Sequence, residues 1–259
     1  VLGISGGDGT NHVTITGFID VYGGSTLPQL AFLRGGTMNT VANSVGVGQG
    51  KPEGLLGRLM RAYDERATKP LANVERYALR IGEDYGFLFG TGAVYGFLAE
   101  YYRGGDPSPL VAAKTLLRGV GSTLVRGEMI RRLARPFRGS VELDDGTSWP
   151  ERDYFSVAGG TIDQIGLGFR PFRRYGERDG AFHLLGIMSS PLQFVQDLPR
   201  IHAAEPMRPN RTFEATPRRA IVRSAEGRVR YMVDGDLHEA PGDELEVSVG
   251  PRVRIVVGT

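Results

Sequence analysis

The first ten residues constrain the fold of this chain more than any other stretch. An apolar run, Val1–Ile4, stops abruptly at the glycine-rich segment 5–10, which reads SGGDGT. A short buried strand that breaks into a glycine turn and then a helix is a common way to build a phosphate cradle, because glycine lets backbone N–H groups approach an anion. The N-terminus of the following helix adds partial positive charge. The segment therefore predicts a phosphate-binding loop.

Asp8 is the unusual residue of this loop. A carboxylate repels phosphate unless Mg²⁺ lies between them, or unless the carboxylate accepts a proton from an attacking hydroxyl. For the loop alone, the alternative is a tight turn in which Asp8 only caps a helix. Under the first interpretation, the loop takes part in nucleotide phosphate chemistry.

The pattern of strand, glycine loop and helix occurs a second time. The apolar run 29–33 leads into the loop 34–40, RGGTMNT, and helical spacing continues to Val45 with Gly46 as a stop signal. Residues 10–23 are expected to be helical from their position, although their Val, Ile and Thr content also suits a strand. Parallel strands bring both loops to one sheet edge. We therefore expect a cleft with two phosphate-facing turns.

An amphipathic helix is expected at 53–67, and Lys69-Pro70 is read as a boundary. After it, the spacing of apolar residues changes from helical to strand-like. Strands are expected at 76–81 and 85–89, and helices at 93–103 and 108–134. From residue 137 the chain reads as short strands with one helix at 191–200. These strands are 137–143, 154–159, 181–188, 211–216, 219–223, 228–234, 244–248 and 252–257. The pattern predicts a sandwich-like or barrel-like second domain.

Composition narrows the classes of partner. The chain has 259 residues and a formal net charge of +2, which is too small to argue for nucleic acid. It contains no cysteine, so a disulfide framework and a thiolate zinc site are excluded. No apolar run is long enough to cross a bilayer, so a lipid substrate would be met at the membrane surface. The four histidines, which show no metal-ligand spacing, are His12, His183, His202 and His238.

Together, the two glycine loops and a late acidic turn resemble the diacylglycerol kinase catalytic-domain family, which includes bacterial lipid kinases and sphingosine kinases. The family's GGDGT loop matches residues 6–10 in full. Its late acidic turn, usually DGE, matches Asp234-Gly235-Asp236, and Asp179-Gly180 and the closing segment 251–257 are also similar. Its second loop, usually P-x-GT-x-ND-x-A, matches at Gly36, Thr37, Asn39 and Ala42.

The resemblance implies an ATP- and Mg²⁺-dependent transfer of the γ-phosphoryl group to a hydroxyl of a diacylglycerol-like or other lipid. It implies an α/β plus β fold, with a partial Rossmann-like nucleotide-binding domain over 1–70. A β-sandwich-like, lipid-binding domain with inserted helices follows over 71–259, and the site lies in the cleft between them. The implied nucleotide-binding residues are Gly6, Gly7, Asp8, Gly9, Thr10, Gly36, Thr37, Asn39 and Asp236.

Two carboxylates are candidates for the base that accepts the proton of the lipid hydroxyl, and by analogy family members differ in which one they use. We expect Asp234 to be the base and Asp8 to act on Mg²⁺ and ATP. On its own, the Asp234 turn has a plain β-turn as its alternative, because Asp-Gly is a common hairpin signal. Asp179 is a candidate for a structural metal, as in some relatives, and a solvated turn aspartate is the alternative.

The sequence departs from the family pattern at three matched positions. Thr40 stands where the second loop usually carries Asp, Val13 where the first helix often carries Glu, and Asp236 where the turn usually ends in Glu. The family's first βα unit has no counterpart before Val1, so we expect the chain as given to be poorly stable or inactive. Two other hypotheses stay open: an NAD-kinase-like enzyme, whose expected Asn-Glu pair is not found, and a catalytically inactive lipid-binding module.

The lipid side of the site is predicted from two features. The cluster Arg131, Arg132, Arg135 and Arg138 would meet anionic headgroups or form a solvated face. Helix 93–103 offers apolar surface for an acyl chain, with core packing as the alternative; its apolar residues are Val94, Tyr95, Phe97, Leu98, Tyr101 and Tyr102.

We expect a cytoplasmic protein that is peripheral at the inner membrane face, and a homodimer is left open.

Overall fold

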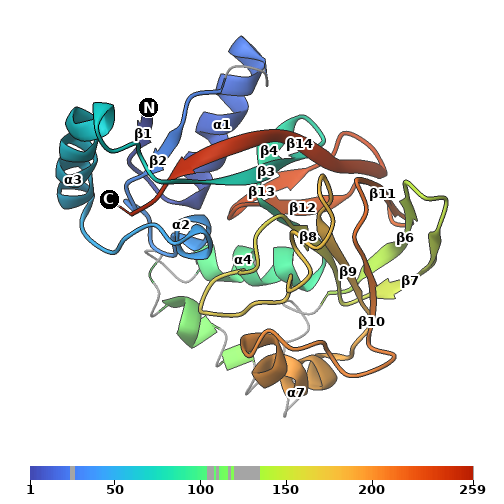
Figure 1. Cartoon of the computed structure of the whole chain (residues 1–259). Helices are drawn as coiled ribbons and strands as arrows, with labels where there is room; N and C mark the ends of the chain where they lie inside the picture. The colour runs from blue at the N-terminus through green and yellow to red at the C-terminus, as the bar shows by residue number, and fades with distance from the viewer. Residues whose placement is uncertain (24–26, 104–107, 109–110, 116–117, 120–134, 259) are drawn as a thin grey trace.

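The computed structural model describes residues 1–23, 27–103, 108, 111–115, 118–119 and 135–258 (Figure 1). Most of the helix expected at 108–134 lies outside these residues, although 111–115 and 118–119 are helical. Arg131 and Arg132 of the expected basic cluster also lie outside them. Among the described residues, no helix combines the length and the apolar character that crossing a membrane requires.

Two parallel strands and their helices form the N-terminal unit. β1 (Leu2–Ile4) pairs with β2 (Leu30–Phe32), and each strand ends in a glycine loop. The helices α1 (Asp8–Tyr22) and α2 (Thr40–Val45) follow these loops, and α2 ends at Gly46 with a left-handed φ of 80°. α3 (Pro52–Asp64) continues into a 3₁₀ turn, Glu65–Ala67. The predicted repeat of strand, loop and helix is confirmed.

One long strand, β14 (Glu244–Val256), joins this unit to the rest of the molecule (Figure 1). It pairs antiparallel with β3 (Asn73–Ile81) and β11 (Arg219–Ser224), and its Ile255 pairs parallel with Leu30 of β2. The register with β3 shifts between Val249 and Arg252. The two separate strands expected at 244–248 and 252–257 are therefore wrong, because β3 pairs on both sides of this bulge and keeps the strand continuous.

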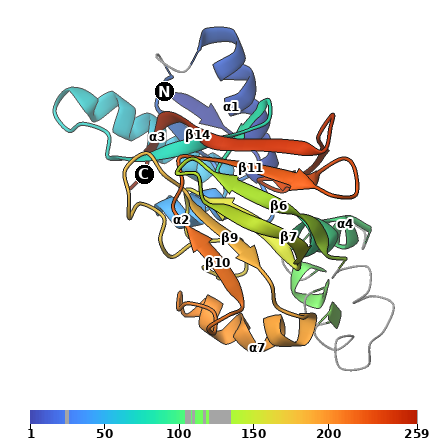
Figure 2. The ribbon, with the colours of Figure 1, turned by 90° about the vertical axis from the view of Figure 1, so that its right-hand side faces the viewer.

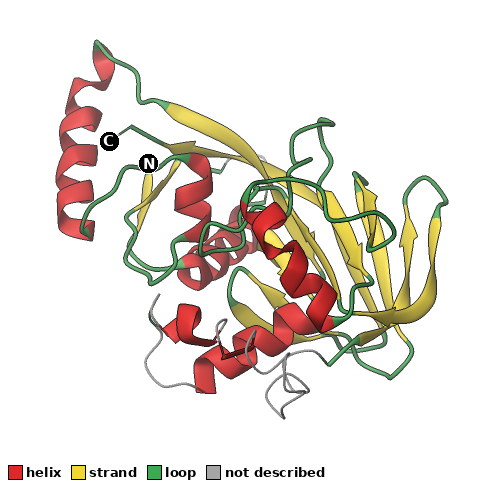
Figure 3. Cartoon of the chain, turned by 90° about the horizontal axis from the view of Figure 1, so that it is seen from below, coloured by secondary structure: helices red, strands yellow, loops and turns green. Residues whose placement is uncertain are grey.

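The strands of both parts of the chain form two sheets, and the first sheet includes β1 and β2 of the N-terminal unit (Figures 2 and 3). One runs in the order β1-β2-β14-β11-β6-β7, with β3 and β4 paired beside β14, and the other is antiparallel in the order β10-β9-β8-β5-β12-β13. The expected α/β plus sandwich-like fold is confirmed. The remaining strands are β4 (Asp84–Gly86), β5 (Leu88–Gly90), β6 (Phe137–Leu143), β7 (Ser148–Tyr154), β8 (Ser156–Gly160), β9 (His183–Ile187), β10 (Thr212–Ala215), β12 (Arg230–Val233) and β13 (Asp236–Glu239).

Two strands, β7 and β13, were not expected from the sequence. The single strand expected at 85–89 is wrong, because β4 and β5 lie there in different sheets. β7 buries only Trp149 and Tyr154, so its sequence has no period-2 alternation. β13 has four residues and directly follows the Asp234-Gly235 turn. Four residues are too few to show an alternating apolar pattern. The strand is stabilised by its pairing with β12.

The core between the two sheets is apolar and fully buried. Leu79 of β3, Phe89 of β5 and Val157 of β8 are at most 1% exposed and belong to one cluster. On the other side of the second sheet, α4 (Ala93–Arg103) packs on β8, β12 and β13, and α7 (Pro191–His202) lies beyond it (Figure 1). The second sheet is therefore covered on both faces.

The two glycine loops touch through their backbones. A Cβ atom at Gly36 would lie 2.1 Å from the Cα atom of Gly7, and one at Gly35 would lie 2.9 Å from the backbone nitrogen of Gly6. Neither distance leaves room for a side chain, so the contact requires glycine on the second loop. The spacing of the two loops is thus fixed by backbone sterics.

We predict that Gly36→Ala lowers the free energy of unfolding by about 1–3 kcal/mol, because the new methyl group must displace backbone atoms. The matched control is Gly57→Ala in α3, where a Cβ atom would meet nothing within 4 Å. That change is expected to raise stability by up to about 1 kcal/mol through helix propensity. Urea midpoints of the two variants measure the difference, and equal midpoints would contradict the steric account.

Candidate active site

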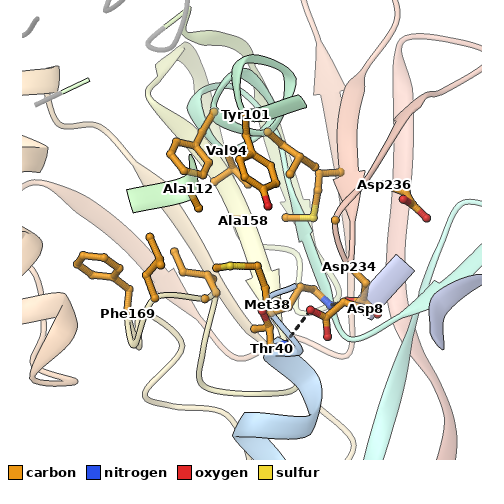
Figure 4. A pocket seen from close by; sticks show the side chains of 18 of the residues that line it. Asp8, Met38, Thr40, Val94, Tyr101, Ala112, Ala158, Phe169, Asp234 and Asp236 are labelled. Carbon is orange, nitrogen blue, oxygen red and sulfur yellow. Dashed lines mark hydrogen bonds between the residues drawn. The ribbon is translucent and has the colours of Figure 1, made fainter. Parts of the chain in front are cut away.

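A cavity of about 740 Å³ lies between the glycine loops, the second sheet and helices α4 and α7. Figure 4 shows Asp8, Asp234 and Asp236 on one side of it and apolar side chains such as Val94 and Phe169 on the other. The predicted carboxylates of the first loop and the late turn are therefore brought to one place. The cavity continues from them into apolar surroundings.

Asp8 links the first glycine loop to the second helix. Its Oδ2 accepts a hydrogen bond from the Thr40 backbone N–H at 2.7 Å, and its Oδ1 accepts one from Val41 N–H at 3.0 Å. Asp8 therefore caps α2 rather than only beginning its own helix. Burial raises the pKa of Asp8, and the hydrogen bonds from Thr40 and Val41 oppose that shift without cancelling it.

Asp234 is the most buried carboxylate of the site. It has a left-handed φ of 44°, and its carboxylate accepts hydrogen bonds from the backbone N–H groups of Phe87 at 3.0 Å and Leu88 at 2.8 Å. Burial raises its pKa well above the usual range, and the negative charges of Asp8 and Asp236 add to this. Such a carboxyl group takes up a proton more readily than an exposed aspartate does.

Asp236 reaches over the beginning of α1. A Cβ atom at Gly9 would lie 2.7 Å from both carboxylate oxygens of Asp236. Within the described part of the chain, no hydrogen bond or ion pair to this carboxylate is found. Of the three aspartates, Asp236 therefore has its oxygens most available to a cation.

The second loop is shaped by Asn39. Its side chain donates to the Gly36 carbonyl at 2.6 Å and accepts from the Gly36 N–H at 3.1 Å, while its own φ is 48°. Asn39 thus closes the loop on itself. Neither Asn39 nor Gly6 lines the cavity, whereas the other seven predicted nucleotide-binding residues do: Gly7, Asp8, Gly9, Thr10, Gly36, Thr37 and Asp236.

Thr40, which departs from the family pattern, has a clear role here. Both its backbone N–H and its hydroxyl bond to the Asp8 carboxylate. An aspartate at this position would place a second negative charge against that buried carboxylate. Threonine at position 40 therefore avoids a second carboxylate beside Asp8, and its hydroxyl donates a hydrogen bond to the Asp8 carboxylate.

Two residues of the site were missed by the sequence analysis. Arg34 is the first residue of the second loop and has a φ of 54°. Its positive charge acts on Asp8, and its guanidinium donates to the Gln49 side chain at 2.9 Å. Tyr102 of α4 donates to the Gly235 carbonyl of the acidic turn at 2.7 Å. The only sequence signal for Arg34 is its place beside the glycines, and Tyr102 was considered only as apolar surface.

The apolar side of the cavity includes the predicted surface of α4. Val94, Phe97, Leu98, Tyr101 and Tyr102 line it, and Tyr95 does not. The same cavity is lined from the second sheet by Leu88, Ala158, Leu185, Ile187 and Met232, and from α7 by Phe194, Leu198 and Ile201. These side chains line the cavity, and several of them, such as Leu88 and Ile187, also belong to the buried core beside it.

Asp179 lies away from this cavity. Its carboxylate accepts hydrogen bonds from the Tyr77 hydroxyl at 3.2 Å and from the Arg252 guanidinium at 2.9 Å, and its side chain is 82% exposed. The guanidinium occupies one side of the carboxylate, and a structural metal at Asp179 stays a prediction. In the basic cluster, Arg135 pairs with Glu226, and Arg138 pairs with acidic residues of β7.

The comparisons with known proteins agree with this arrangement. Residues 1–69 match the family model described as the diacylglycerol kinase catalytic domain. None of the curated proteins matches the chain. The predicted resemblance to the diacylglycerol kinase catalytic-domain family is confirmed, and with it the relation to a family of kinases.

Three solved structures from Bacillus anthracis str. Sterne share the fold. A diacylglycerol kinase is 16% identical with a TM-score of 0.61, and the match covers 97% of this chain and 74% of that one. A second, named provisionally as a diacylglycerol kinase, is 17% identical with a TM-score of 0.67, over 97% and 75% of the chains. A third, similarly named, is 16% identical with a TM-score of 0.64, over 98% and 76%. At 16–17% identity, these structures show only that this chain shares their fold.

The raised pKa of Asp234 leads to a pH-dependent prediction. Above about pH 4 the unfolded chain releases this proton while the folded protein retains it, so the stability of the folded state falls as pH rises toward the folded pKa. Asp234→Asn removes this loss and tolerates the positive φ. We predict that it raises the free energy of unfolding relative to wild type, and that the gain grows as the pH rises above about 4.

Urea unfolding at several pH values measures this gain. Asp145→Asn is the control, since Asp145 lies in an exposed turn and accepts hydrogen bonds from the backbone N–H and the hydroxyl of Thr147. It should give no gain. A difference between Asp234→Asn and wild type that stays constant with pH would contradict the assignment.

Proposed function

We propose that this protein, whose residues 1–69 match the diacylglycerol kinase catalytic domain, is an ATP-dependent lipid kinase. It would transfer the γ-phosphoryl group to a hydroxyl of a diacylglycerol-like lipid. The observation that carries this proposal is one cavity with two glycine loops and three aspartates on one side and apolar side chains on the other. Phosphate chemistry and lipid binding need these two environments side by side.

The nucleotide is proposed to bind at the glycine loops. Gly7, Gly9 and Gly36 line the cavity, and the N-terminus of α1 adds positive potential for the phosphates. Mg²⁺ is bound in kinases by one or two carboxylates and the substrate phosphates, all through oxygen. Asp8 and Asp236 fit this donor set and would hold it. When bound, Mg²⁺ neutralises phosphate charge during transfer.

The lipid is proposed to enter with its acyl chains against the second sheet and α4. Burial of these chains would position the headgroup hydroxyl beside Asp234, whose raised pKa suits a general base. The hydroxyl proton passes to Asp234, the oxygen bonds to the γ-phosphorus, and the bond from that phosphorus to the ADP oxygen breaks. Asp234 later releases the proton to water.

The two proposed domains divide these tasks. Residues 1–70 would supply the nucleotide-binding loops, and residues 71–259 the apolar lining and the base. β14 crosses between them, because it pairs with both β2 and β11. Because the lipid resides in a membrane, we place the working protein at the inner face of the membrane, as a peripheral protein in the cytoplasm.

The proposal predicts that label from [γ-³²P]ATP appears in lipid when the protein meets Mg²⁺ and vesicles of total bacterial lipid. Asp234→Asn should reduce the rate at least about 10²-fold, the usual contribution of a general base. Asp145→Asn, in an exposed turn, is the matched control and should keep the rate. Label in added NAD instead, or vesicle binding without transfer, would overturn the proposal.

A second prediction concerns the apolar lining. Ala158 of β8 is 4% exposed and lines the cavity. We predict that Ala158→Leu lowers kcat/KM for dioleoylglycerol about tenfold more than for dioctanoylglycerol, because a few added methylene groups exclude a long chain first. Ala225→Leu, in an exposed turn, is the control. Equal losses for both lipids would place the acyl chains elsewhere.

A further inference from the structure

His12, Asp84 and His238 meet on the side of α1 that faces β4 and β13. One potential ligand atom from each of the three lies within 4.8 Å of the others. Within the described part of the chain, this is the one group of three such side chains close enough to share a metal ion. The histidines are distant in sequence, so their spacing gave no sign of this cluster.

The ring of His12 is held in the orientation of a ligand. Its Nδ1 lies 2.8 Å from the Tyr85 carbonyl oxygen, which only accepts hydrogen bonds. Nδ1 therefore carries the proton of the neutral ring, and Nε2 keeps its lone pair. Nε2 lies 4.0 Å from Oδ1 of Asp84. Metal-binding histidines are oriented in this way by their second ring nitrogen.

His238 approaches the same carboxylate from β13. Its Nδ1 lies 3.2 Å from Oδ2 of Asp84, and its Nε2 is buried without a hydrogen-bond partner among the described residues. Donors bound at about 2.0–2.1 Å to tetrahedral zinc lie about 3.3 Å apart. Nδ1 of His238 and Oδ2 of Asp84 are already at that separation, whereas Nε2 of His12 lies 4.0 Å from the other oxygen, Oδ1, so a small movement of these side chains brings all three to one ion.

The charges around the cluster favour a cation. The charged groups that act on His238 are Asp84, His12 and Asp236, and none of them is an arginine or lysine. The side chain of His12 is 2% exposed, while those of Asp84 and His238 are about a quarter exposed, which leaves a path for an ion. Two imidazoles and one carboxylate suit Zn²⁺ and similar divalent ions better than Mg²⁺.

We propose that His12, Asp84 and His238 bind one divalent ion of the Zn²⁺ class, with water completing its coordination. The ion ties α1 to the β3–β4 hairpin and to β13. Asp236 and His238 share one face of β13, so the ion fixes the acidic turn against the helix that follows the first glycine loop. This site is distinct from the oxygen-donor site proposed for Mg²⁺, and it does not depend on the proposed lipid kinase activity.

The test is ion binding by the chelator-treated protein, with Mg²⁺ in excess to occupy oxygen-donor sites. Titration with Zn²⁺ by calorimetry is expected to give one equivalent, and Co²⁺ is expected to give the visible absorption of a four-coordinate site. Saturating Zn²⁺ should raise the Tm by roughly 5 °C. His238→Gln should weaken binding of both ions at least tenfold and abolish the absorption.

His202→Gln is the matched control, because His202 is exposed on α7, where it packs against Phe169. It should bind as wild type does. Asp84→Asn is the second cluster variant, and circular dichroism reports whether each variant folds. Wild-type affinity in a folded His238→Gln or Asp84→Asn protein, or no binding by wild type, overturns the proposal.

Discussion

The site depends on the contact between the two glycine loops and on the carboxylate of Asp8 that locks it. The loops approach through glycine backbones, and Asp8 then accepts the first N–H groups of α2. This joins the end of β1 to the start of α2, although some thirty residues separate them. The same carboxylate faces the cavity, so the group that holds the loops together also lies where phosphates would bind.

The burial of negative charge at this site costs folding free energy. Asp8 and Asp234 both have raised pKa values because they are removed from water, and Asp234 also lies near the charges of Asp8 and Asp236. Backbone N–H groups compensate part of the desolvation. Buried carboxylates beside an apolar cavity cost folding free energy even when they are hydrogen-bonded, so such a cluster points to a functional site.

The sequence predicts the parts of this structure that are set by local rules. Both glycine loops, the helices after them and α4 follow from periodicity and turn chemistry, and the two loops with Asp234-Gly235-Asp236 indicate the family. Three features depend on tertiary contacts and could not be read from the chain. These are the capping of α2 by Asp8, the continuity of β14 through its bulge, and the meeting of His12 with His238. Each joins segments that are distant in sequence.

The central claim is that nucleotide and lipid bind on opposite sides of one cavity. Mn²⁺ can replace Mg²⁺ on ATP, because both accept oxygen ligands, and it relaxes nearby nuclei strongly. The direct measurement is the relaxation of ¹³C-labelled dioctanoylglycerol bound to the protein together with Mn²⁺·ATP. The account predicts fast relaxation at the hydroxyl-bearing carbon and slower relaxation toward the chain ends. Equal relaxation along the lipid, or none, would contradict it.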